Sequence, residues 1–436
     1  MLDLDAIKKR RNQYMERIGT DAVALLHSPP ESLRNGDAHF PFRQSSDIVY
    51  LTGFTEPGTT VLLRPGSKQP FVMFVRPRDP EREIWDGRRA GVDGAVVNYG
   101  ADAAYPAAEL AEKLPVLISN VDELHYGLGD NRSFDELVIR TVAGLRRKER
   151  SGMRPPKKIS DPRFVLHQQR LIKRPDEIST LRHACDITCS AHRAAMAAAQ
   201  AGMMEYELEA LVNGHFRQAG GCGPGYTSIV GAGENATILH YIENSAVIGD
   251  GDLILIDAGC EYDAYTADVT RTFPASGRFS PPQKQVYELV LKAEQAGISM
   301  TQPGVTLEQI HERTISVLTE GLVELGILSG PVSERIADNS FKRYYMHRTS
   351  HWLGLDVHDV GTYKIDGHDR QLEDGMVITV EPGIYIAKDD PKVAAEYRGI
   401  GIRIEDDVLV TASGCDVLTA DAPKSVEAVE AACSTS

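Results

Sequence analysis

The chain has 436 residues, and 47 Lys and Arg against 62 Asp and Glu give a formal net charge of −15 at pH 7. Charged residues make up 25% and apolar residues 42% of the chain, which excludes a disordered or fibrous protein. The acidic balance and the lack of an apolar run near the roughly 18 residues of a membrane helix predict neither nucleic acid nor membrane as a partner. The N-terminus shows no apolar signal-peptide pattern, so we expect a cytoplasmic protein.

Residues 1–165 alternate short apolar runs with polar helical patterns, which predicts a mixed α/β domain. Strands are expected at 22–26, 48–51, 61–63, 71–75 and 116–118. Ser133 and Glu136 have the spacing of a capping box, which predicts a helix from there toward Arg150. The run 151–158 is basic and contains paired prolines that cannot continue a helix, so the domains are predicted as 1–165 and 170–436.

In the second part, helical patterns are expected at 175–202, 206–218, 281–299 and 307–325, the last ended by Gly326. Two segments, 251–259 and 375–383, share one pattern: Gly, a variable residue, four mostly apolar residues, a carboxylate, a second variable residue and a final Gly. This similarity suggests a weak internal duplication. The six cysteines contain no CxxC pair, so we interpret them as free thiols and not as a zinc site.

The duplicated segments place Asp257 and Glu381 at the ends of apolar strands. An unpaired buried charge is unfavourable, so each carboxylate needs hydrogen bonds, a cation or a metal. Residues 265–273 are expected to form the next strand, in a hairpin that brings Asp268 beside Asp257. Two adjacent carboxylates repel each other unless a cation lies between them.

Further candidates lie nearer the C-terminus. The strand pattern 401–405 places Arg403 and Glu405 on one face. Three histidines fall within twelve positions, and a fourth, His240, precedes the first carboxylate; the three are His347, His351 and His358. Four acids with one or more imidazoles suggest an oxygen-rich dinuclear site for Mn²⁺, with Co²⁺ or Zn²⁺ as alternatives.

Five of these residues resemble, in order and spacing, the metal ligands of the pita-bread metallopeptidases: Asp257, Asp268, His351 in Ser-His-Trp-Leu-Gly, Glu381 in Glu-Pro-Gly-Ile-Tyr, and Glu405 in Gly-Ile-Arg-Ile-Glu. The segments 42–47, 50–54 and 84–89 look like those of bacterial aminopeptidase P, the Xaa-Pro aminopeptidases. The resemblance covers nearly the whole chain. It implies an α/β (α+β) protein in which a mixed N-terminal domain, serving substrate access and oligomer contacts, precedes a pita-bread catalytic domain.

The resemblance implies that Asp268 and Glu405 bridge two divalent cations. Asp257 would complete the ligands of one cation, and His351 and Glu381 those of the other. The implied reaction releases the N-terminal residue from peptides with proline second, by attack of a metal-bridging hydroxide on the scissile carbonyl. Glu381 would serve as general base and then as proton donor to the proline nitrogen.

Other roles follow from the same resemblance. His240, His347 and His358 would line the site and contact the substrate. Arg403 would lie beside the bridging glutamate, and Tyr385 near the cluster. Trp85 resembles a residue that reaches a neighbouring subunit's pocket, which implies substrate binding there and a homo-oligomer, either dimer or tetramer. Purely structural roles stay open for His358, Trp85, Tyr385 and Arg403.

Several activities are possible on this fold. The complete ligand set argues against a creatinase and against a non-catalytic binding module, and the N-terminal domain argues against a methionine aminopeptidase. An Xaa-Pro dipeptidase (prolidase) stays an alternative, because the choice depends on room beyond the proline. Arg348 stands where many relatives carry glycine; it either faces solvent or alters entry to the pocket.

Overall fold

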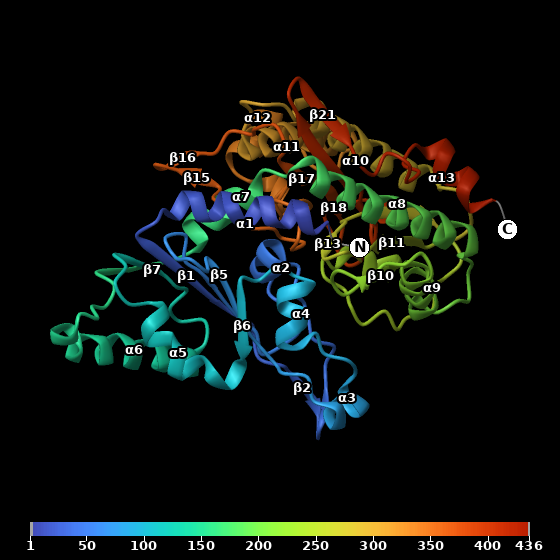
Figure 1. Ribbon diagram of the computed structural model, residues 1–436. Coiled ribbons are helices and arrows are strands. Elements are labelled where there is room, and N and C mark those ends of the chain that lie inside the picture. The colour runs from blue at the N-terminus through green and yellow to red at the C-terminus, as the bar shows by residue number, and fades with distance from the viewer. Residues whose placement is uncertain (1–2, 435–436) are drawn as a thin grey trace. The chain divides into compact units, whose positions relative to one another are not determined.

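The computed structural model describes residues 3–434, and the chain divides into two compact units, Met1–Gln169 and Arg170–Ser436 (Figure 1). Helix α7 (Arg163–Leu171) spans the point of division. No helix among residues 3–434 is long and apolar enough to cross a bilayer. Each unit has its own buried core, and the two are described separately.

Unit 1 is built on a six-stranded sheet in the order β6-β5-β4-β1-β7-β8, in which β4 runs antiparallel to β1 and β5. Its strands are β1 (Ala22–His27), β4 (Thr60–Leu63), β5 (Phe71–Val75), β6 (Ala103–Pro106), β7 (Glu123–His125) and β8 (Lys158–Ser160). Its helices are α1 (Leu4–Ile18), α2 (Ser46–Thr52), α3 (Pro80–Asp86), α4 (Gly91–Val97), α5 (Leu110–Leu117) and α6 (Arg132–Arg147), and β2 (Leu33–Asn35) pairs with β3 (Ala38–His39). Every residue of β4 and β5 is buried, which explains their continuous apolar runs.

Three local predictions in unit 1 were wrong. Residues 48–51 lie in helix α2, which ends at Gly53 in the left-handed conformation, because an apolar run of four residues does not distinguish strand from helix. Residues 116–117 end helix α5, and Ile118 caps it. Asn131, not Ser133, caps helix α6 by accepting the Phe134 N–H, and this helix ends at Arg147.

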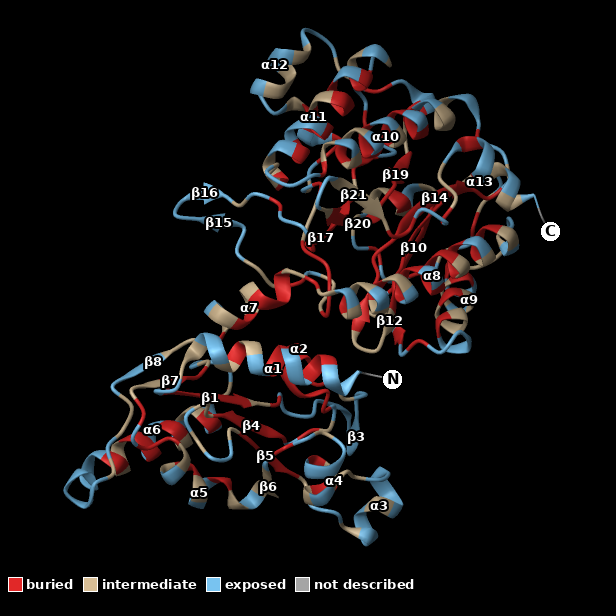
Figure 2. Ribbon diagram, turned by 45° about the horizontal axis from the view of Figure 1, so that its top comes forward, coloured by how far each residue is buried: buried red, intermediate tan, exposed pale blue. Residues whose placement is uncertain are grey.

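In unit 2 long helices pack around short strands, most of which are buried, whereas the pair β15 and β16 is exposed (Figure 2). The helices are α8 (Pro175–Ala198), α9 (Glu205–Gln218), α10 (Pro281–Met300), α11 (Leu307–Glu324), α12 (Val332–Ala337) and α13 (Val426–Cys433). The strands are β9 (Gly223–Pro224), β10 (Ile229–Ala232), β11 (Leu253–Asp257), β12 (Cys260–Tyr262), β13 (Tyr265–Thr266), β14 (Thr270–Pro274), β15 (Lys364–Ile365), β16 (His368–Asp369), β17 (Val377–Val380), β18 (Gly383–Tyr385), β19 (Gly401–Arg403), β20 (Asp406–Thr411) and β21 (Gly414–Val417).

The two segments of the suggested duplication become β11 and β17. Strand β11 lies between β10 and β14, and β17 pairs antiparallel with β20. Asp257 is the last residue of β11, and Glu381 directly follows β17. Each carboxylate therefore sits where a buried strand ends.

The segment 265–273 is not one strand, which corrects the predicted hairpin. It divides into β13 and β14, and Asp268 lies in the connection between them. Thr270, not Asp268, is the register partner of Asp257. At the start of this excursion Gly259 passes very close to Ala267: a Cβ on Gly259 would lie 1.7 Å from the Ala267 carbonyl oxygen.

Candidate metal centre

Strand ends and short connections in unit 2 bring the five predicted metal ligands together. Asp268, His351 and Glu405 each offer one ligand atom, and these atoms all lie within 4.8 Å of one another. The His351 Nε2 atom is 3.4 Å from Asp268 Oδ2 and 3.6 Å from Glu381 Oε1. Asp257 is joined to the group through Tyr226, whose hydroxyl lies 2.6 Å from Asp257 Oδ1 and 2.5 Å from Asp268 Oδ1. The geometry thus forms one acid-rich cluster with a single imidazole in it.

The carboxylates of this cluster destabilise one another's charged forms. Burial raises the pKa of Glu405 well above its usual range, and the charges of Asp268 and Glu381 add to this rise. Burial also raises the pKa of Glu381 to about 7, although the nearby His351 charge opposes it. Burial raises the pKa of Asp257 too, against the lowering effect of Arg403. Such a cluster needs added positive charge to be fully ionised.

The imidazole of His351 is oriented for a metal. Its Nδ1 atom lies 3.0 Å from the Trp352 carbonyl oxygen and donates a hydrogen bond to it when protonated, which leaves Nε2 facing the carboxylates. Burial alone would lower the pKa of His351, but Asp268 and Glu381 raise it to about 9. The four carboxylates and the His351 imidazole therefore form an oxygen-rich donor set with one nitrogen, which fits a hard or intermediate divalent cation such as Mn²⁺, Co²⁺ or Zn²⁺.

Arg403 and Tyr385 lie beside the cluster and are linked to each other. The Arg403 Nη2 group donates to Asp257 Oδ2 at 2.6 Å, and its Nη1 group donates to the Tyr385 hydroxyl at 3.1 Å. The prediction that Arg403 shares a face with Glu405 leads to the right region, but the direct ion pair is with Asp257. Burial raises the pKa of Tyr385 to about 12, so its hydroxyl keeps its proton.

The histidines divide into two groups around the cluster. His347 Nε2 lies 2.9 Å from the Tyr385 hydroxyl, and its Nδ1 lies 2.8 Å from the Arg348 carbonyl oxygen. Burial and the Arg403 charge lower the pKa of His347 to about 3, so the ring is neutral, with Nδ1 donating to the carbonyl and Nε2 accepting from Tyr385. The His358 ring packs edge-on against His351 with 4.3 Å between ring centroids, and His240 lies on the same cavity wall.

A cavity of about 970 Å³ opens over the cluster. Its lining includes His240, His347, His358 and the five predicted ligands. Apolar side chains complete the wall, among them Leu239, Ile242 and Met346. This volume is large enough for a small peptide and not only for a single amino acid.

Arg348 lies at this cavity and is half-exposed to solvent. Its guanidinium forms an ion pair with Glu308 of helix α11, and both residues line the cavity. The effect of Arg348 on entry to the pocket stays a prediction. Trp85 lies on helix α3 of unit 1 and is 86% exposed.

Two functional residues were missed by sequence reasoning. Tyr226 bridges Asp257 and Asp268 but lies 31 residues before Asp257, and only its glycine-rich approach, 220–225, marks the segment as irregular. Thr270 donates its hydroxyl proton to Glu405 at 2.6 Å. The alternation of 270–273 predicts a strand there but does not show which carboxylate the hydroxyl meets.

Comparisons with known proteins agree with this geometry. A model of the aminopeptidase P N-terminal domain matches residues 7–125, and a model of metallopeptidase family M24 matches residues 179–412. The chain belongs to metallopeptidase family M24. This M24 chain is 43% identical over 426 residues to the Xaa-Pro aminopeptidase of Escherichia coli K12, covering 97% of this chain and 96% of that protein.

Solved structures extend the comparison to the fold of this M24 protein. The aminopeptidase PepP of Pseudomonas aeruginosa superposes with a TM-score of 0.97 at 49% identity, covering 99% of this chain and 98% of that one. A zinc-substituted aminopeptidase P of Escherichia coli in complex with product gives a TM-score of 0.96 at 42% identity, covering 99% and 98%. The predicted fold, a mixed α/β N-terminal domain followed by a pita-bread domain, is confirmed.

Proposed function

We propose that this M24 metallopeptidase is an Xaa-Pro aminopeptidase, which releases the N-terminal residue from peptides with proline in the second position. The observation that carries the proposal is the convergence of Asp268, His351 and Glu405 at one point beneath a cavity of peptide size. The full-length similarity to the Xaa-Pro aminopeptidase of Escherichia coli supports the same activity. The relatives named above are aminopeptidases, which disfavours the alternative of an Xaa-Pro dipeptidase.

Five residues of this chain would hold the metal: Asp257, Asp268, His351, Glu381 and Glu405. We propose two divalent cations, with Mn²⁺ as the native metal and Co²⁺ or Zn²⁺ as substitutes, because four carboxylates and one imidazole form a mainly hard donor set. When bound, the two cations would lower the pKa of a shared water toward neutrality and polarise the scissile carbonyl.

The protein's own groups would handle the proton and the substrate. Glu381 faces both histidine groups, since its Oε1 lies near His351 and its Oε2 is 3.7 Å from His347 Nδ1. From this position Glu381 would take a proton from the attacking water and return it to the proline nitrogen as that nitrogen leaves. A neutral His347, fixed by Tyr385, would contact the substrate together with His240 and His358.

Arg403 would hold the acidic side of the site in place. Its guanidinium is buried and ion-paired with Asp257, and its second arm fixes Tyr385. In this way the Arg403 guanidinium orients the predicted metal ligand Asp257 and, through Tyr385, the substrate-facing His347. Both groups therefore keep their positions while the peptide enters and leaves.

The test compares peptides and metal states in one assay. Free amino acid is measured from a tripeptide with proline second, from a longer peptide with the same start, and from the dipeptide of the same first two residues. The proposal expects rapid release from the two longer peptides, little from the dipeptide, and loss of all release after chelation until Mn²⁺ is restored. Preference for the dipeptide would establish a dipeptidase instead, and full activity after chelation would contradict a metal mechanism.

We further propose that the protein acts in the cytoplasm as a homo-oligomer, dimer or tetramer. Ile84 and Trp85 on helix α3 are 81% and 86% exposed, and large apolar side chains exposed side by side are typical of interaction surfaces. Trp85 from one copy would then contribute to substrate binding in another. Light scattering of the parent and of Trp85→Ala tests this: a monomeric parent would contradict the proposal.

A further inference from the structure

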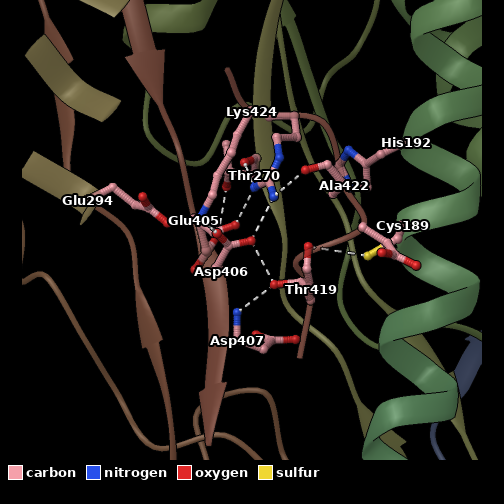
Figure 3. Close-up of polar contacts among 12 residues, drawn as sticks. Cys189, His192, Thr270, Glu294, Glu405, Asp406, Asp407, Thr419, Ala422 and Lys424 are labelled. Atoms are coloured by element: carbon pink, nitrogen blue, oxygen red, sulfur yellow. Dashed lines mark hydrogen bonds and ion pairs between the residues drawn. The ribbon is translucent and has the colours of Figure 1, made fainter. Parts of the chain in front are cut away.

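A layer of buried polar residues lies next to Glu405 (Figure 3). Thr270, the first residue of β14, belongs to this layer and has no exposed surface. It is not part of the cavity lining. Any effect of Thr270 on the reaction must therefore act through its neighbours, and Figure 3 shows Glu405 beside it.

The Thr270 hydroxyl connects two charged groups of the site. It lies 2.6 Å from Glu405 Oε2 and 3.0 Å from Arg403 Nε. A guanidinium can only donate hydrogen bonds and an ionised carboxylate can only accept them. The hydroxyl must therefore accept from Arg403 and give its single proton to Glu405, which fixes the direction of this chain of hydrogen bonds.

The main chain of Thr270 forms a further hydrogen bond with Glu405. The Thr270 carbonyl oxygen accepts the Glu405 N–H at 3.1 Å and the Arg271 Nη1 group at 2.9 Å. The same Nη1 group donates to the Glu405 carbonyl oxygen at 2.6 Å. The N–H, the carbonyl and one carboxylate oxygen of Glu405 are thus all bound to residues 270–271.

Arg271 is itself held by a buried ionic group. Its Nη2 group donates to Asp406 Oδ1 at 2.6 Å, and Lys424 forms ion pairs with both Asp406 and Glu294. Arg271, Asp406 and Glu294 have no exposed surface. This arrangement gives a fixed support to the start of β20, directly after Glu405, as Figure 3 shows around Asp406 and Lys424.

Arg403 extends the effect of Thr270 to a second ligand. Its Nε–H binds Thr270, and its Nη2 group binds Asp257 Oδ2 at 2.6 Å. The Thr270 hydroxyl is therefore linked to two predicted metal ligands. It binds Glu405 directly, and it is connected to Asp257 through Arg403. Without it, both the Glu405 carboxylate and the Arg403 Nε–H would lose a buried partner.

We propose that Thr270 is a positioning residue for the metal centre, whose hydroxyl orients the Glu405 carboxylate and, through Arg403, the Asp257 carboxylate. The inference rests on the proposed function. It assigns the hydroxyl a main effect on metal affinity and turnover and a smaller effect on peptide binding, because Thr270 does not reach the cavity and is linked to His347 only through Arg403 and Tyr385. Partners that orient metal ligands commonly change metal affinity by about 10- to 100-fold.

The experiment removes the hydroxyl with little change in shape. Thr270→Val and Thr270→Ala lack it, whereas Thr270→Ser keeps it. Thr319→Val is the matched control, since Thr319 is equally buried but donates only to the Ile315 carbonyl within helix α11. For each protein, Mn²⁺ affinity is measured by competition with a chelating dye, and kcat and KM are measured with the proline tripeptide at limiting and saturating Mn²⁺.

The proposal expects Mn²⁺ to bind Thr270→Val about 10- to 100-fold more weakly than the parent, with lower kcat and a smaller change in KM. Thr270→Ser and Thr319→Val should stay near the parent. Parent-like Mn²⁺ affinity in Thr270→Val would overturn the inference, as would an equal loss in Thr319→Val. If circular dichroism shows that Thr270→Val does not fold, the Ser and Ala variants decide between the same outcomes.

Failure of this inference differs from failure of the proposed function. If the parent binds Mn²⁺ and cleaves the tripeptide while the hydroxyl has no effect, only the role of Thr270 is wrong. If the parent neither binds Mn²⁺ nor cleaves the tripeptide, the proposed function fails, and the inference fails with it.

Discussion

Two of the sites in unit 2 that contain buried carboxylates differ in the balance of negative and positive charge. In the metal centre, Asp257, Asp268, Glu381 and Glu405 face one another with Arg403 as the cation paired to Asp257. At the other site, Asp359 lies between two cations: its oxygens are 2.6 Å from Arg170 Nη2 and 2.9 Å from Lys173 Nζ, and Arg170 also pairs with the more exposed Asp356 at 2.8 Å.

The two sites shift carboxylate pKa values in opposite directions. Burial alone would raise the pKa of Asp359, but Lys173 and Arg170 hold it below its usual range. In the metal centre the pKa values of Asp257, Glu381 and Glu405 are raised instead. A buried acid therefore does not by itself indicate a metal; an excess of acids over cations does.

Metal removal should give the largest effect. Chelation is expected to lower kcat with the proline tripeptide by about a thousandfold, because several kcal/mol of transition-state stabilisation are lost. Added Mn²⁺ should restore the rate. The metal content of the same samples, measured by mass spectrometry, shows whether kcat follows bound metal. Full kcat in the metal-free protein would contradict the inference that the excess of acids at this site holds a metal.

Replacing the proposed proton carrier should be the next largest effect. Glu381→Gln is expected to lower kcat by about 10²-fold, because an amide cannot transfer the proton. Circular dichroism should show an unchanged fold. Glu427→Gln, an exposed glutamate of helix α13, serves as control and should keep the parent rate. A Glu381→Gln variant with near-parent kcat would exclude this role.

Amide substitutions should change stability with opposite signs at the two sites. Asp359→Asn is expected to lower the free energy of unfolding by about 3 kcal/mol, because it removes the buried carboxylate charge that Arg170 and Lys173 share. Glu405→Gln should raise that free energy in metal-free protein at pH 8 by about 1 kcal/mol, because it removes one repelling charge. Urea titrations of the chelated proteins measure both values. The same sign in both variants would show that charge balance does not separate the sites.

The pH dependence of Asp359 should give the smallest effect. A carboxylate with a lowered folded-state pKa stabilises the protein above its unfolded-state pKa, and this contribution is lost as the pH falls toward the folded-state value. The stability difference between parent and Asp359→Asn should therefore shrink as the pH falls below about 3.8. Urea titrations of both proteins from pH 6 to pH 3 test this; a constant difference would contradict it.

The sequence predicted most of the metal centre because its ligands occupy distinctive local contexts. Asp257 and Glu381 end apolar strands, and His351 and Glu405 lie in motifs that resemble those of one family. Whether all five ligate metal stays a prediction. The four longest helices of unit 2, α8 to α11, were also predictable, because their caps and apolar periodicity are local, whereas the shorter α12 and α13 were not predicted.

Contacts between distant segments could not be predicted. Tyr226 meets Asp257 and Asp268 only after the chain has passed through four short strands, β10 to β13. The pairing of Thr270 with Glu405 joins residues 135 apart in sequence. Short apolar runs failed for a different reason: 48–51 became helix α2 because the decision between strand and helix depends on tertiary packing.

Gly259 has no functional group, yet the position of Asp268 depends on it. The smallest side chain there would occupy the space of the Ala267 carbonyl. The loop would have to widen, and the neighbouring ligand would move with it. In a saturation-mutagenesis screen we therefore expect Gly259 to tolerate as few replacements as the acidic metal ligands. A residue without a functional group would then be as informative about activity as the ligands are.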